Sequence, residues 1–352
     1  MRLDDLRDEI DGALGKTLDE ATRRLTEAAP SLAQPAVLLQ RANDGGKRIR
    51  PTLVLTGHRL IAGNHADAMG PALATELLHV CALLHDDVID AAATRRGRPS
   101  FHVAAADAHR AAGWRGDADG HGRAAAILFG DLAFVLADDV FFQSAAPADR
   151  LLHAHRVFTA MREEVMRGQY LDIEAAARGS ASVEQALAIA RDKSGRYTIT
   201  RPAEIGAALA GAPPPIVAAL QSWGDPLGLA FQLTDDLLGM FGDAAVTGKD
   251  PTTDLREGKR TVLVAVALTT LGAADAERLD RLLGRPALGD DELDWMRATI
   301  AGSGAPDAVR ARIRQLVEEA LHALETIRAL DSDDTAVALL TELTGELADR
   351  DR

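Results

Sequence analysis

Apolar residues recur at helical spacing along almost the whole chain, and this periodicity limits the folds that the chain can adopt. Leu6, Ile10, Leu14 and Leu18 mark one face of a first amphipathic helix, and residues 313–330 repeat the pattern near the other end. Turn signals separate the helical stretches, and no alternating pattern runs long enough to predict a sheet. Aromatic residues make up only 4% of the chain, which favours helices over strands. We therefore predict an all-α protein.

The length of the chain and the spacing of its turn signals predict one domain rather than several. With 352 residues, 47% of them hydrophobic, the chain can bury a large core. No segment has the composition of a linker, so we expect a single large helical bundle over residues 1–352. Residues 107–123 are rich in glycine and charge, and we expect them to form an exposed loop.

Charge and cysteine content exclude several classes of protein. The formal net charge of −14 argues against binding to nucleic acid. A single cysteine, Cys81, excludes an internal disulfide and suits a reducing cytoplasm. The most apolar stretches, 70–85 and 124–142, are interrupted by charged residues, and residues 1–20 are too charged to be a secretion signal. We expect a cytoplasmic protein that is not integral to a membrane.

One short segment concentrates charges of both signs. Within residues 83–100 the charged side chains are Asp86, Asp87, Asp90, Arg95, Arg96 and Arg98. On a helix Asp86 and Asp90 share a face, and no basic residue at helical spacing neutralises them. Unpaired carboxylates at the end of an apolar run are costly unless a cation binds there, and their oxygens suit Mg²⁺. The arginines beyond would then hold a phosphate. The segment predicts a Mg²⁺–diphosphate site or, in the simpler alternative, a surface cluster of salt bridges.

The same design occurs a second time. Asp235 and Asp236 come late in another apolar helix, and a loop that contains Lys249 and Lys259 follows them. Asp-Asp pairs also occur where they simply suit a helix start, so the pair alone carries little information. The repeated order of apolar helix, paired aspartates and basic residues predicts two acidic helix ends that face one another across one metal cluster.

Six segments, in order, resemble the motifs of the polyprenyl synthetase family, the trans-isoprenyl diphosphate synthases, and point to bacterial geranylgeranyl diphosphate synthases. The segments are GGKRIRP (45–51), ELLHVCALLHDDVIDAAATRRGRP (76–99), GQYLDIE (168–174), KSGRYT (193–198), FQLTDDLLG (231–239) and GKDPTTDLREGKRT (248–261). This resemblance implies the isoprenoid synthase type of fold, a helical bundle around a central apolar cavity. It also implies a transferase that condenses isopentenyl diphosphate with an allylic diphosphate (dimethylallyl, geranyl or farnesyl), using several Mg²⁺ ions, in a homodimer.

The resemblance assigns roles residue by residue. It implies direct Mg²⁺ ligation by Asp86, Asp90 and Asp235, with Asp87, Asp236 and Asp172 in support. It implies a subsite for isopentenyl diphosphate made by Lys47, Arg50, His79 and Arg96. It implies a clamp on the allylic diphosphate made by Arg95, Lys193, Ser194, Lys249 and Lys259. Gln169 and Gln232 would lie near the reacting carbons. The residues expected to act in catalysis are Asp86, Asp90, Lys193, Gln232, Asp235 and Lys249. His79 has an alternative role as a core histidine, and Gln169 and Asp172 as structural hydrogen-bonding residues.

The second acidic motif departs from the family pattern, which has a third aspartate where this chain has Gly239. Either the missing carboxylate is dispensable, or the second metal site is weakened and the protein is a non-catalytic subunit of a heteromeric synthase. A terpene cyclase of the same fold is a further alternative, although GGKRIRP and the pair Arg95–Arg96 argue against it.

The length of the product depends on the residues one helical turn before Asp86. Cys81 and Ala82 are small, whereas bulky aromatic residues there resemble those of farnesyl-length (C15) synthases. We expect geranylgeranyl diphosphate (C20), with Leu77 and Leu78 near a deeper floor. A farnesyl product and a product of C25 or longer are the alternatives.

Overall fold

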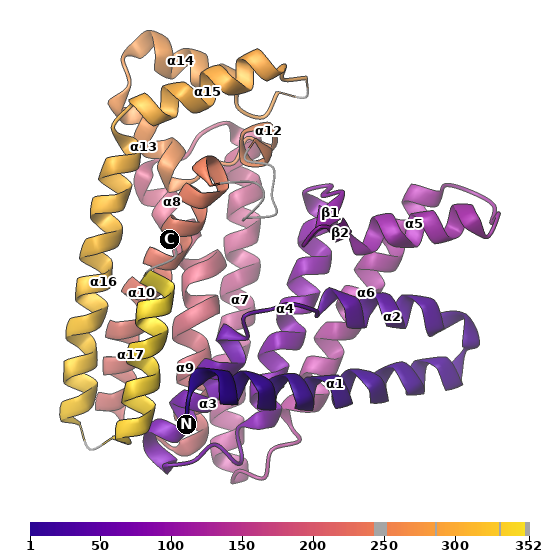
Figure 1. Cartoon of the computed structure of the whole chain (residues 1–352), viewed down its shortest axis with the longest axis vertical. Helices are drawn as coiled ribbons and strands as arrows, with labels where there is room; N and C mark the ends of the chain where they lie inside the picture. The colour runs from indigo at the N-terminus through magenta and orange to yellow at the C-terminus, as the bar shows by residue number, and fades with distance from the viewer. Residues whose placement is uncertain (243–251, 286, 331, 349–352) are drawn as a thin grey trace.

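The computed structural model describes residues 1–242, 252–285, 287–330 and 332–348, and these are helical almost throughout (Figure 1). The all-α prediction is confirmed. In the first part of the chain the helices are α1 (Leu3–Ala28), the short 3-10 helix η1 (Pro30–Leu32), α2 (Ala33–Ala42), α3 (Ile49–Ala62), α4 (Met69–Ile89), α5 (Phe101–Ala111), α6 (Ala118–Phe141) and α7 (Ala148–Arg178).

The remaining helices follow along the chain. They are α8 (Val183–Ala190), the π-helix η2 (Arg191–Thr200), α9 (Arg201–Ala210), α10 (Pro214–Phe241), α12 (Thr253–Glu257), α13 (Val262–Thr270), α14 (Ala273–Leu282), α15 (Asp290–Gly302), α16 (Ala305–Ala329) and α17 (Asp334–Ala348). None of these described helices is both long enough and apolar enough to cross a membrane.

The core forms where the apolar faces of the helices meet. Leu6, Ile10, Leu14 and Leu18 of α1 are all buried, so the first predicted amphipathic face is confirmed. The largest buried side chain is Trp223 of α10, whose indole N–H donates to a hydroxyl on α17 over 3.0 Å. A buried indole that keeps a hydrogen-bond partner avoids the cost of an unsatisfied polar group.

Two details differ from the expectation. The exposed connection predicted over 107–123 is shorter, because α5 continues to Ala111 and α6 begins at Ala118. Most of the charged residues at these helix ends are exposed, so their composition resembles that of a loop. In addition, a two-residue strand pair, which the sequence pattern is too short to reveal, follows α4: β1 (Thr94–Arg95) pairs antiparallel with β2 (Arg98–Pro99).

The π-helix η2 packs closely between α7 and α10. A Cβ on Gly168 of α7 would lie 2.4 Å from the backbone nitrogen of Lys193, and a Cβ on Gly228 of α10 would lie 2.5 Å from the carbonyl oxygen of Gly195. Only glycine fits at such contacts. π-Helical turns are rare and often occur at functional sites. This close packing places Lys193 and its neighbours between two of the long helices.

The predicted acidic motifs lie at the same end of the bundle. Figure 1 shows α4, α7 and α10 running lengthwise, with β1–β2 beyond the end of α4 and α12 beyond the end of α10. The chain directions of α4 and α10 therefore bring the ends that carry the paired aspartates to one end of the molecule.

Candidate active site

The first acidic motif occupies the last turn of α4. Asp87 is only 3% exposed, and Asp86 and Asp90 are partly exposed. Arg95 of β1 donates to Asp87 Oδ1 from Nε over 2.9 Å and from Nη2 over 2.5 Å, and its Nη2 lies 3.5 Å from Asp86 Oδ2. The expectation that these carboxylates lack a basic partner was therefore wrong. The partner comes from the hairpin after the helix, so helical spacing could not reveal it.

Lys259 joins the loop of the second motif to the first motif. Its Nζ donates to Asp90 Oδ2 over 2.8 Å and lies 2.5 Å from Glu257 and 3.8 Å from Asp254. Burial alone lowers the pKa of this ammonium, but the attraction of Asp90 and Asp254 outweighs it and the pKa is raised. Lys259 thus links the first acidic motif to the segment that follows the second one, and carboxylates from α4 and α12 hold its charge.

The helix α7 and the π-helix η2 complete this group. Gln169 Nε2 donates to Asp86 Oδ1 over 3.1 Å, and Lys193 Nζ donates to Asp172 Oδ2 over 2.6 Å. Ser194 follows Lys193 in η2 and is partly exposed. The structure therefore brings both predicted α7 residues, Gln169 and Asp172, into contact with predicted site residues.

The second motif lies on α10 and carries concentrated negative charge. Asp236 is 8% exposed and accepts a hydrogen bond of 2.7 Å from Gln232 Nε2. Burial, together with the carboxylates of Asp254, Asp235 and Asp172, raises the pKa of Asp236 to about 8, although the Gln232 hydrogen bond opposes this. Carboxylates from α7, α10 and α12 thus act on one buried position.

These carboxylates do not form a ready-made metal cage. Within the part of the chain that the structure describes, no three histidine, cysteine, aspartate or glutamate side chains come together as ligands of one metal ion. Asp86, Asp87, Asp90 and Asp172 instead pair with Arg95, Lys259 and Lys193. The basic groups expected to clamp a diphosphate therefore bond the groups expected to bind the metal.

Residues predicted to bind isopentenyl diphosphate lie deeper and beside the hairpin. Arg50 Nη2 donates to Thr198 Oγ1 over 2.8 Å, and the guanidinium carbon lies 4.3 Å from the centre of the Tyr197 ring. The Tyr197 hydroxyl lies 3.5 Å from His79 Nδ1. Burial, and then the charge of Arg50, lower the pKa of His79 well below its ordinary value.

Lys47 and Arg96 lie on two segments that contact each other. Arg96 donates to the backbone carbonyl of Asp44, which ties the hairpin to the glycine-rich segment before Lys47. Arg48, the residue between Lys47 and α3, has φ +53° and is buried against Glu76, to which its Nη1 donates over 2.7 Å. A non-glycine residue in the left-handed region costs free energy and persists only where its surroundings hold it.

The position of the missing third aspartate is next to another carboxylate. A Cβ built on Gly239 would lie 3.4 Å from Asp254 Oδ2. Asp254 belongs to the motif GKDPTTDLREGKRT, but spacing along the sequence could not place it beside Gly239. Negative charge is therefore present where the family pattern puts its third carboxylate, although it comes from α12 instead of α10.

One face of α4 is partly accessible. His79, Ala82, Leu83 and Asp86 lie on it and are partly exposed, whereas Val80, Cys81 and Leu84 between them are buried. Cys81, in contrast, packs among residues of α5 and α6, and burial raises the pKa of its thiol to about 12. Ala82 therefore lies on the face of Asp86, and Cys81 does not.

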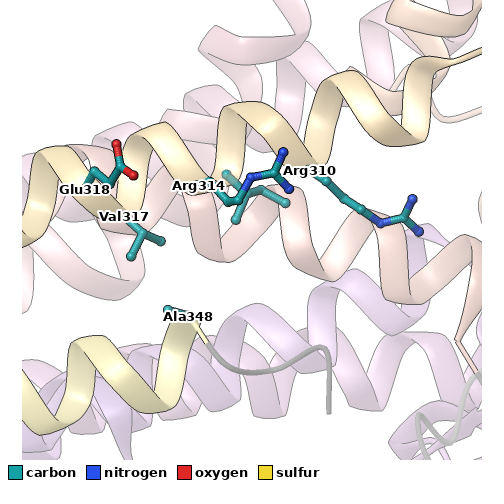
Figure 2. Close-up of a pocket in the computed structure, with 6 residues that line it drawn as sticks. Arg310, Arg314, Val317, Glu318 and Ala348 are labelled. Carbon is teal, nitrogen blue, oxygen red and sulfur yellow. The ribbon is translucent and has the colours of Figure 1, made fainter.

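Lys249, predicted to clamp the allylic diphosphate, falls outside the described residues. The pocket in Figure 2, about 380 Å³, lies between α16 and the end of α17 and contains none of the predicted site residues. Its lining residues are Arg310, Ile313, Arg314, Val317, Glu318 and Ala348.

An all-α bundle that gathers paired aspartates and basic side chains at one end defines the class of isoprenoid synthases, and comparison with known proteins agrees. The solved structure of geranylgeranyl pyrophosphate synthase from Corynebacterium glutamicum, described as complexed with isoprenyl diphosphate and magnesium, superposes with a TM-score of 0.93 at 34% identity, over 99% of this chain and 100% of that one. A sequence model of the polyprenyl synthetase family matches residues 34–300. The chain belongs to the polyprenyl synthetase family and is a transferase.

The names of curated relatives state different products. A geranylfarnesyl diphosphate synthase of Aeropyrum pernix is 34% identical over 82% of this chain and 86% of that protein. A (2E,6E)-farnesyl diphosphate synthase of Mycobacterium tuberculosis is 31% identical over 88% of this chain and 80% of that protein. The likeness therefore supports a trans-prenyl diphosphate synthase and leaves the chain length of the product open.

Proposed function

We propose that this enzyme condenses isopentenyl diphosphate with an allylic diphosphate and releases inorganic diphosphate. The observation that carries the proposal is the contact of Lys259 with Asp90, which brings the loop of one acidic motif onto the other. In the reaction the allylic C–O bond breaks and diphosphate leaves with the electron pair. The double bond of isopentenyl diphosphate supplies the electrons of the new C–C bond, and a proton then leaves to the released diphosphate.

The donor set suits Mg²⁺, because it consists of carboxylate oxygens. Asp86, Asp90 and Asp235 would hold the metal, with Asp87 and Asp236 in support. The metal would supply Lewis-acid stabilisation of the leaving diphosphate. The crowding of carboxylates around buried Asp236 fits a bound cation, because a cation would relieve their repulsion.

The chain's own basic residues would absorb the charge of the leaving group. Arg95, Lys193 and Lys259 each bond a carboxylate in this structure. We infer that these three residues release the carboxylates and bind diphosphate oxygens instead when substrate and metal bind. Lys249 and Ser194 would bind diphosphate oxygens as well. Fixed cations that face developing negative charge stabilise it without reorganisation. Apolar helix walls would keep water from the allylic cation.

A C20 product is the form of the proposal that the site favours. Ala82 lies one turn below Asp86 on the same accessible face, and it leaves room where an aromatic side chain would block a growing chain. The names of several solved neighbours, among them geranylgeranyl pyrophosphate synthases of Corynebacterium glutamicum and Pyrococcus horikoshii, support the same length. Dimethylallyl, geranyl and farnesyl diphosphates would be the allylic partners.

We also propose that the protein is a cytoplasmic homodimer in which each subunit is a single domain. The ion pair of Arg162 with Asp138 joins α7 to α6. Along these two helices large apolar side chains are exposed, which is typical of an interaction surface. They are Ile127, Leu128, Val135, Phe142, Leu152, Met166, Tyr170 and Ile173. A second copy of the chain would cover them.

Product analysis tests the reaction. The purified protein would be incubated with Mg²⁺, isopentenyl diphosphate and, separately, each of the three allylic diphosphates, and dephosphorylated products would be identified by mass. A linear C20 alcohol supports the proposal, and a different linear length corrects only the product. Hydrocarbon formed from an allylic substrate alone would identify a cyclase. The absence of product would favour a non-catalytic subunit.

A further inference from the structure

Arg50 stands apart from the other basic residues of the site in the partners that it contacts. Arg95, Lys193 and Lys259 each bond an aspartate, whereas the described contacts of Arg50 are an aromatic ring and a hydroxyl. Its positive charge is therefore not neutralised by the groups that hold it in place. A cation held by neutral groups can give its full charge to an anionic ligand.

The ring beneath Arg50 belongs to Tyr197 of the π-helix η2. The guanidinium carbon lies 4.3 Å from the ring centre, and Tyr197 is only 3% exposed. Attraction between a cation and an aromatic face is strongest where water is excluded. Burial raises the pKa of the Tyr197 hydroxyl, so the ring remains neutral.

The residue after Tyr197 fixes the orientation of the guanidinium. Thr198 is 1% exposed, and its Oγ1 accepts a hydrogen bond of 2.8 Å from Arg50 Nη2. The ring contact and the hydrogen bond from Nη2 thus both hold the guanidinium in place. The Nε of Arg50 is buried and has no hydrogen-bond partner among the described residues.

We propose that Tyr197 is a positioning residue that holds the Arg50 guanidinium in place for the diphosphate of isopentenyl diphosphate. This inference rests on the proposed function, because it takes Arg50 to be part of that subsite. Lys193, expected at the allylic diphosphate, lies four residues earlier in η2. One π-helical segment would therefore support both substrate subsites, through Lys193 directly and through Tyr197 by way of Arg50.

Substitutions at the ring and at the hydroxyl test the proposal separately. Tyr197→Leu removes the aromatic face, and we expect the KM and calorimetric Kd for isopentenyl diphosphate to rise about tenfold. The KM for the allylic substrate should change less than about twofold. Tyr197→Phe keeps the ring and should change both values less than about threefold. Thr198→Val, a smaller change, should raise the isopentenyl diphosphate values about threefold to fivefold.

Phe158→Leu is the matched control. Phe158 is also fully buried beneath an arginine, with the Arg162 guanidinium carbon 4.5 Å from its ring centre. This substitution removes a comparable contact at a place that contains no predicted site residue. It should lower the thermal unfolding midpoint much as Tyr197→Leu does and leave both KM values unchanged.

A double-mutant cycle with Arg50→Ala decides whether Tyr197 acts through Arg50. In the Arg50→Ala background Tyr197→Leu should have no further effect on the binding of isopentenyl diphosphate. An equal effect in both backgrounds, or an effect no larger than that of Phe158→Leu, would overturn the proposal. Because calorimetry measures binding without turnover, a wild-type protein that binds isopentenyl diphosphate but forms no product would overturn only the proposed reaction.

Discussion

Lys259 donates to Asp90 across 2.8 Å, although 169 positions separate the two residues in the sequence. This contact joins the first acidic motif to the segment that follows the second one. It also means that metal binding and release of this lysine are linked, because both require the same carboxylate.

The first prediction concerns Asp90 itself. Asp90→Ala should lower kcat by about 10²–10³-fold, because it removes a carboxylate expected to hold Mg²⁺. The fold should persist, since Asp90 is partly exposed at the end of α4 and Lys259 keeps Glu257 as a partner. Turnover and far-UV circular dichroism would be measured together. A folded Asp90→Ala protein with a near-normal rate would contradict the metal assignment.

The departure at Gly239 gives the second prediction. Gly239→Asp should not strengthen Mg²⁺ binding, because its new carboxylate would lie against Asp254 and the like charges would repel. Asp254→Asn should instead weaken Mg²⁺ binding severalfold. Calorimetric titration with Mg²⁺ and a diphosphate measures both. A gain of affinity in Gly239→Asp, with no loss in Asp254→Asn, would show that Asp254 does not supply the missing charge.

Asp236 predicts how stability depends on pH. Its pKa of about 8 in the folded protein lies above the ordinary value of 3.8, so the folded state binds a proton that the unfolded state has released. The free energy of unfolding of the metal-free protein should therefore fall as the pH rises from about 4 to about 8. Asp236→Asn should remove this contribution and raise the unfolding midpoint at pH 8 by about 2 °C or more.

Thermal unfolding at a series of pH values, in EDTA and in excess Mg²⁺, checks this prediction. Bound Mg²⁺ favours the charged carboxylates, so the slope should be smaller in its presence. An identical slope in wild-type protein and Asp236→Asn would show that another group governs the pH dependence.

The two proposed diphosphate subsites predict that substitutions at each affect one substrate more than the other. Lys47→Ala should raise mainly the KM for isopentenyl diphosphate, and Lys193→Ala mainly that for the allylic substrate, each by about tenfold. Lys193 bonds Asp172 on α7, whereas Lys47 precedes α3, so the two lysines come from different parts of the fold. Steady-state kinetics with each substrate varied would measure both KM values. Equal effects of each substitution on the two KM values would contradict the assignment of the two lysines to separate subsites.

The accessible face of α4 predicts control of product length. Ala82→Phe should shift the product, C20 in our proposal, towards C15 or shorter, because the aromatic ring would fill the face one turn below Asp86. Product masses after dephosphorylation measure the change. Unchanged products in a folded Ala82→Phe protein would place the floor of the cavity elsewhere.

Helical periodicity predicted the all-α fold and the buried face of α1, because a helix repeats its pattern locally. The six family segments also predicted the aspartates of both acidic motifs and the basic residues around them. The assumption that Asp86 and Asp90 lack a basic partner failed, since Arg95 and Lys259 reach them from a hairpin and from a distant loop. The predicted extent of the loop over 107–123 was wrong as well, because exposed charged residues at helix ends give the composition of a loop.

The sequence by itself determined the elements, the family and the chemical types of the site residues, since these depend on spacing within single segments and on short motifs. Only the tertiary structure decided which groups contact one another: Lys259 with Asp90, Asp254 beside Gly239, and Tyr197 beneath Arg50. Such pairings depend on how long helices cross and on where their ends meet. The packing of the whole bundle fixes those relations, and no local pattern records them.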